Sequence, residues 1–138
     1  GKGAEAQKSY EATMSATPNA PVAANNLAFI YAQQGTNLDQ ALQLATTAKQ
    51  RMPEDANVDD TLGWIYVKRG QHQQAIPHLQ ASLKRSPGVP EVLYHLGMAY
   101  AGVGDKAQAR ATLEQALKLD PKVGGEEARR TLQTVSQP

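Results

Sequence analysis

The chain has 138 residues, a formal net charge of +1 and no cysteine. A charge this close to zero lacks the basic stripe that nucleic acid binding demands, and the absence of cysteine excludes disulfides and thiolate metal sites. No apolar run approaches the length of a membrane span. The N-terminus, GKGAEAQ, has neither an initiator methionine nor a hydrophobic signal region, so we expect a soluble fragment of a longer chain. Its compartment stays open between the cytoplasm and a bacterial periplasm.

Residues 1–20 predict one helix. Ala6, Tyr10 and Met14 recur every four residues, and Pro18 follows the last of them, which is the pattern of a single amphipathic stripe. We interpret this segment as the second helix of a truncated repeat whose first helix is missing. Tyr10 and Met14 would then lack the cover of a preceding helix, and an uncovered apolar edge predicts self-association into a homo-oligomer.

Residues 21–123 repeat a pattern at a fixed interval. Leu62 returns as Leu96 and Tyr66 as Tyr100, because 96 − 62 and 100 − 66 both equal 34. The residues that return after the same interval are Leu62, Gly63, Tyr66, Gly70, Ala75 and Pro87. A period of this length indicates stacked structural units, which we place at residues 21–55, 56–89 and 90–123.

Each unit predicts two helices separated by a glycine turn. In the third unit, apolar residues at helical spacing precede Gly104 and resume after it, which gives one apolar stripe for each helix. Pro90 suits the first turn of the first helix, and Asp105 suits the N-cap of the second. A pair with two such stripes can bury them only against neighbouring pairs, so stacking is obligatory.

These residues resemble the tetratricopeptide repeat (TPR) family, whose pattern is Leu-Gly-x-x-Tyr followed by Gly, Ala, a large apolar residue, Ala or Ser, and Pro. The third unit matches nearly throughout. The second has Ser82 for the usual alanine and Asp59 at the usual tryptophan position, and the first has Ala28 for glycine and Ala45 for the large residue. The resemblance implies an all-α, right-handed TPR superhelix, an α-solenoid of antiparallel helix pairs with a partial N-terminal repeat.

The sequence motifs NNLAxxY, DTLGW and YHLGxA also resemble, more loosely, the closing repeats of large bacterial TPR proteins, including exosortase-associated TPR lipoproteins of polysaccharide export.

Residues 124–138 complete the array. Ala128, Leu132 and Val135 form one narrow apolar stripe among charged and polar residues, which is typical of a C-terminal capping helix.

The sequence gives no sign of catalytic chemistry. GVGDKA at 102–107 spells a dinucleotide fingerprint, but that motif needs a preceding strand, and here a helix is expected. His72, His78 and His95 are not spaced as converging metal ligands, and we interpret them as turn and surface histidines. No serine or histidine is placed with an acid for nucleophilic catalysis. We therefore expect no enzyme activity, no cofactor and no metal.

The resemblance implies a concave groove lined by the first helix of each unit. The inward positions in the three units are Asn25, Phe29 and Gln33, then Asp60, Trp64 and Lys68, then Tyr94 and Met98. Stacking would align Phe29, Trp64 and Met98 as an apolar ladder that anchors a peptide. The alternative is that the neighbouring units simply cover Trp64.

Related inward positions hold Asn25, Asn26, Asp60, Thr61, Glu91 and His95, which argues against the lysine- and arginine-rich carboxylate clamp of some TPR modules. We predict a non-catalytic protein–protein interaction module that binds a peptide or helix of a partner in the groove. The alternative is a structural, self-assembling scaffold segment of a larger bacterial protein, in polysaccharide export for example.

Overall fold

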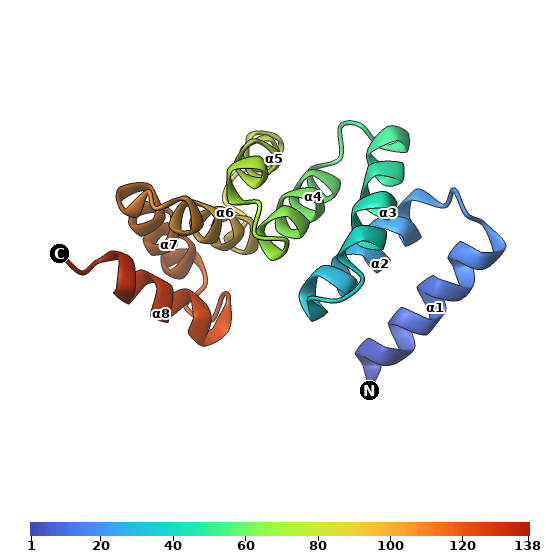
Figure 1. The fold of residues 1–138 in the computed structure, drawn as a ribbon, viewed down its shortest axis with the longest axis horizontal. Coiled ribbons are helices and arrows are strands. Elements are labelled where there is room, and N and C mark those ends of the chain that lie inside the picture. The colour runs from blue at the N-terminus through green and yellow to red at the C-terminus, as the bar shows by residue number, and fades with distance from the viewer.

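The computed structural model describes all residues 1–138 and consists of eight α-helices. Their bounds are α1 Lys2–Ala16, α2 Pro21–Gln34, α3 Leu38–Arg51, α4 Ala56–Lys68, α5 His72–Arg85, α6 Pro90–Val103, α7 Lys106–Leu119 and α8 Gly125–Val135. They pack as antiparallel pairs, α2 with α3, α4 with α5 and α6 with α7, which confirms the all-α prediction. Figure 1 shows the pairs following one another, with the two chain ends at opposite ends of the array.

The turns inside the pairs depend on glycine. Gly35, Gly70 and Gly104 have φ angles of 69°, 78° and 84°, in the left-handed region that residues with a Cβ avoid. The predicted turn glycines are thus confirmed. Gly104 ends α6, so the GVGDKA motif follows a helix and not a strand.

Aspartates begin two of the helices. The Asp55 carboxylate accepts hydrogen bonds from the backbone N–H groups of Asn57 and Val58, at 2.8 and 3.3 Å, at the start of α4. Asp105 accepts one from Gln108 at the start of α7, as the sequence predicts. These side chains satisfy N–H groups that have no partner within the helix.

The Leu-Gly-x-x-Tyr motif packs one helix of a pair against the other. A Cβ on Gly97 of α6 would lie 2.6 Å from the Leu113 side chain of α7, and a Cβ on Gly63 of α4 would collide with Leu79 of α5. Only glycine allows this close approach. Tyr100 is buried, but Tyr66, at the equivalent position one unit earlier, is only half-buried and stacks on His78.

A buried carboxylate ties three helices together. Asp59 of α4 is 1% exposed and pairs with Lys49 of α3 at 2.7 Å and Arg85 of α5 at 3.2 Å. It occupies the position where the family usually has tryptophan. Ion pairs stand where the resemblance would place a large ring, and both cations are partly exposed.

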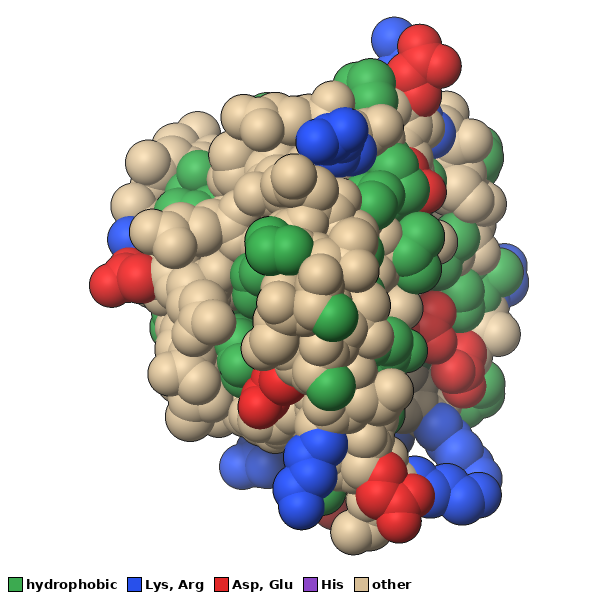
Figure 2. Space-filling model, turned by 90° about the vertical axis from the view of Figure 1, so that its right-hand side faces the viewer, with side chains coloured by type: hydrophobic (Ala, Val, Ile, Leu, Met, Phe, Trp, Pro, Cys, Tyr) green, Lys and Arg blue, Asp and Glu red, His purple; other side chains and the backbone are tan.

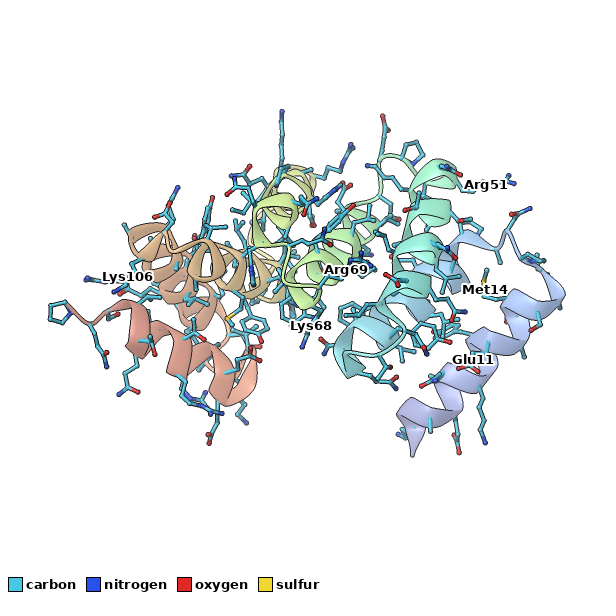
Figure 3. The ribbon with its side chains drawn as sticks, viewed as in Figure 1. Glu11, Met14, Arg51, Lys68, Arg69 and Lys106 are labelled. Carbon is cyan, nitrogen blue, oxygen red and sulfur yellow. The ribbon has the colours of Figure 1, made fainter.

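The two ends of the array differ. In α1 no residue is fully buried, although Tyr10 and Met14 pack partly against the core beside α2. In Figure 3, Glu11 and Met14 lie on the side of α1 that faces the neighbouring helices, and Tyr31 donates its hydroxyl to Glu11. Figure 2 shows hydrophobic side chains at this end in small separate groups among polar atoms. At the other end, α8 buries Ala128 and Val135.

Candidate binding groove

A groove follows the first helices of the pairs, α2, α4 and α6, and is closed at its ends by α1 and the start of α8. It consists of two adjoining hollows that share Phe29, Glu91 and His95. The first, here named the α1-side pocket, has a volume of about 550 Å³ and reaches Tyr10 of α1. The second, the α8-side pocket, has about 420 Å³ and reaches Glu127 of α8. The shared residues make the two hollows one continuous surface.

The α1-side pocket combines apolar side chains with hydrogen-bond acceptors. Phe29 and Ile30 supply half-buried apolar surface, and Asn25 and Asp60 supply polar groups. Asn25 is 9% exposed, and its Oδ1 has no hydrogen-bond donor within the chain. A buried acceptor without a partner costs about 1–3 kcal/mol, so an N–H donor from outside would be stabilised there.

His95 lies at the junction of the two pockets. It is 3% exposed, and its Nδ1 lies 2.7 Å from Oδ1 of Asp60. The interpretation of His95 as a surface histidine is therefore wrong. His95 comes one repeat after Thr61, because 95 − 61 equals 34, so stacking of the two units places the ring against α4, beside Asp60.

The Trp64 indole is the floor of the groove and not an exposed anchor. It is 2% exposed, its Nε1 donates a hydrogen bond of 2.6 Å to Gln33 Oε1, and His95 stacks on it at 4.0 Å between ring centroids. The Lys68 ammonium lies 4.9 Å from its ring centroid, and Figure 3 labels Lys68 at the end of α4. The expectation of an open indole is wrong because side chains from both neighbouring units cover it.

Tyr94 is also covered. Its ring lies 5.5 Å from that of Trp64, and a Cβ on Gly124 would come within 2.6 Å of the Tyr94 ring. Its hydroxyl donates to Glu127 of α8 at 3.1 Å. Burial, together with the Glu127 carboxylate, raises the Tyr94 pKa well above its ordinary value of 10.0. The tyrosine therefore remains a neutral donor that ties α8 to α6.

The predicted groove residues divide between the pockets. Those in the α1-side pocket are Asn25, Phe29 and Asp60, and those in the α8-side pocket are Phe29, Gln33, Trp64, Lys68 and Tyr94. Met98 lines neither pocket and packs, half-buried, against the core. Of the apolar ladder, only Phe29 and Met98 keep exposed surface.

Sequence reasoning did not assign Ile30 or Glu127 to the groove, and it named Glu91 and His95 as inward positions only to exclude a carboxylate clamp. The useful signal was the repeat interval itself. A residue one period after an inward position lies on the same face of the next unit, as His95 follows Thr61 by 34 residues and lies beside Asp60.

The groove is acidic. Its charged side chains are Asp60, Glu91 and Glu127 against Lys68 alone, and the Lys68 ammonium is already engaged over the Trp64 ring. The α1-side pocket contains no lysine or arginine. Low-dielectric walls strengthen the field of such charges, so this surface favours cations over anions.

Stacked helix pairs around one concave groove define the class of α-solenoids. A tetratricopeptide repeat family profile matches residues 66–124, and the chain belongs to this family. It is 42% identical over 79 residues to the cellulose synthase operon protein C of Escherichia coli, a match that covers 57% of this chain. The chain spans 7% of the length of that protein.

Solved structures of other proteins have the same fold as this chain. A thermophilic TPR protein of Thermus thermophilus is similar with a TM-score of 0.76 and 24% identity, over 94% of this chain and 70% of that one. The first TPR of Spaghetti, solved bound to the HSP90 peptide SRMEEVD, has a TM-score of 0.74 and 18% identity, over 85% and 90%. None of the eight helices combines the length and apolar character required to cross a membrane.

Proposed function

We propose that the chain is a non-catalytic interaction module that binds a segment of a partner protein in the groove. The observation that carries this proposal is the continuous concave surface across α2, α4 and α6, together with the Asn25 Oδ1 that lacks a donor. A peptide backbone presents N–H groups that can donate a hydrogen bond to this oxygen. The peptide-bound Spaghetti structure, which shares the fold, supports peptide binding by a domain of this fold.

The ligand class differs from that of an acidic peptide such as SRMEEVD. Asp60, Glu91 and Glu127 would lie opposite its carboxylates, and like charges across an interface cost binding energy. The half-buried Phe29 and Ile30 offer apolar contacts, so the bound segment should carry apolar side chains, in an extended or helical form.

A displayed library of random peptides, selected on the immobilised chain, tests the proposal. Phe29→Glu should abolish enrichment, whereas Gln74→Glu, on an exposed position of α5, should retain it. Amide NMR signals of Phe29 and Glu91 should shift when a selected peptide is added to the wild-type chain. Failure to enrich any peptide, or equal binding by both variants, would overturn the proposal.

The second candidate is a self-assembling scaffold segment of a larger bacterial protein that serves polysaccharide production. Two observations favour it: α1 has no fully buried residue, and the Escherichia coli relative is named for the cellulose synthase operon. In this role α1 of one copy would pack against another copy in the way that successive repeats pack within the chain. The oligomeric state in solution, treated below, distinguishes it from the first.

A further inference from the structure

We propose that the α1-side pocket takes the cationic side chain, lysine or arginine, of the bound partner segment. The inference rests on the proposed groove function and adds the charge of the partner. It places the cation between Asn25, Asp60 and Glu91, on the floor made by His95.

The first step concerns unused acceptors. Asn25 Oδ1 has no donor within the chain although the residue is nine-tenths buried. Asp60 uses Oδ1 to bind His95 at 2.7 Å, and its other oxygen has no partner within the chain. Glu91 is exposed at the rim, between the two pockets. The ammonium and guanidinium groups only donate hydrogen bonds, and bonds from a cation to a carboxylate are among the strongest in proteins.

The second step concerns competing charge. No lysine or arginine lines the α1-side pocket, so nothing in the chain neutralises Asp60 and Glu91 from within it, apart from the His95 contact. The ammonium of Lys68 lies in the other pocket, 4.9 Å from the Trp64 ring centroid. An anionic or neutral side chain would leave the two carboxylates without a counter-charge.

The third step separates a polypeptide from a free cation. Phe29, Ile30, Val89 and Tyr10 supply apolar walls to the same pocket. The methylene stem of lysine or arginine can lie along such walls while the charged end reaches the acceptors. A small polyamine carries the positive charge, but it lacks the adjoining apolar side chains with which a peptide would fill the rest of the groove.

The test uses three short end-capped peptides with one shared leucine–alanine frame and lysine, glutamine or glutamate at the variable positions. The lysine peptide should bind on the order of tenfold tighter than the glutamine peptide, and the glutamate peptide should bind weakest. The preference should shrink as salt is raised. Spermidine alone serves as the competitor and should displace the lysine peptide poorly.

Variants locate the effect. Glu91→Gln and Asp60→Asn should each lower lysine-peptide affinity several-fold and glutamine-peptide affinity by less, so that the preference for the lysine peptide shrinks. Glu54→Gln, an exposed acid outside the groove, is the matched control and should change neither. Glu91 lies on the surface, so its variant tests the inference even where Asp60→Asn disturbs the His95 contact.

Equal or tighter binding of the glutamate peptide, an unchanged lysine preference in both variants, or no binding of any of the three peptides would each overturn the inference. A different outcome is that the library yields peptides that bind the groove through neutral or acidic side chains. That result would contradict this inference alone and would agree with the proposed function. Tight spermidine binding would assign the pocket to a free cation instead.

Discussion

The imidazole of His95 lies almost flat on the indole of Trp64, with ring centroids 4.0 Å apart and 20° between the planes. The two residues belong to the first helices of consecutive pairs, α6 and α4. His95 also contacts Asp60 of α4, so one ring joins the two units by a stack and a polar contact. The floor of the groove is therefore part of the packing between repeats, and a partner bound as proposed would contact the rim.

This relationship predicts that Trp64→Ala destabilises the fold strongly. Removing a fully packed indole costs about 3–5 kcal/mol of unfolding free energy, and the variant also frees Gln33 Oε1 and one face of His95. Urea unfolding measures the loss. Tyr66→Ala is the control, because Tyr66 is only half-buried, and it should cost clearly less. A larger loss for Tyr66→Ala than for Trp64→Ala would reject this account of the groove floor.

Tight packing between the paired helices predicts that Ala109→Leu is destabilising. Ala109 has no exposed surface on α7, and extra methylenes in such a position cost about 1–3 kcal/mol. Ala111→Leu, two residues along the same helix but exposed, should change stability by less than about 0.5 kcal/mol. Equal melting temperatures for the two variants would contradict the register of the repeat.

The fold could be predicted because its signals are local and repeat. Gly104 gives a turn, Asp105 caps a helix, and Gly97 with Leu113 sets the distance between paired helices. Each of these acts within one unit, and the interval of 34 residues then repeats it along the chain. The sequence pattern therefore carried the architecture.

The groove could not be predicted to the same depth. Periodicity shows which face of α4 carries Trp64, but not which side chains the next unit lays over it. Burial of Trp64 depends on His95 and Tyr94, two adjacent residues of α6 that both turn toward α4. The local sequence of Asp59 indicates only a residue that favours a helix start. Its ion pairs come from α3 and α5, which that local sequence does not reveal.

The ion pairs of Asp59 predict an unequal effect of removing each partner. A double change of Lys49→Met and Arg85→Met would leave the Asp59 carboxylate buried and unpaired, and breaking a buried pair in this way costs about 3–5 kcal/mol. Asp59→Asn leaves only two cations that are already partly exposed. It should therefore cost less, which unfolding of both variants in urea at neutral pH measures. The reverse order would show that the cations do not stabilise the carboxylate.

The position of α1 at the end of the array, where none of its residues is fully buried, predicts association between copies of the chain. Tyr10 and Met14 are only half-buried, and apolar surface at the end of a helical array favours contact with another array. Light scattering after size-exclusion chromatography should show species larger than a monomer as concentration rises, and Tyr10→Glu should reduce them. Thr46→Glu, an exposed change on α3, is the control. A mass that stays monomeric at every concentration would exclude the scaffold role.

Stability should fall in mildly acidic solution because of His78 on α5. Burial lowers the His78 pKa below its ordinary value of 6.5, and Lys49 acts in the same direction while the Asp59 charge opposes both. The side chain also stacks on Tyr66, with ring centroids 5.4 Å apart. The folded state thus binds this proton less readily than the unfolded chain does.

The sign follows from proton linkage. Between the lowered folded pKa and 6.5, the unfolded chain holds more protons, so the free energy of unfolding rises with pH. The contribution of His78 is fully present above 6.5 and is lost as pH falls below that value toward the folded pKa. Urea unfolding across this range should show wild type losing more stability than His78→Gln, whose amide does not titrate. All other residues are the same in both proteins, so the difference between them isolates His78. A difference between the two proteins that does not change with pH would show that the His78 proton is not linked to folding.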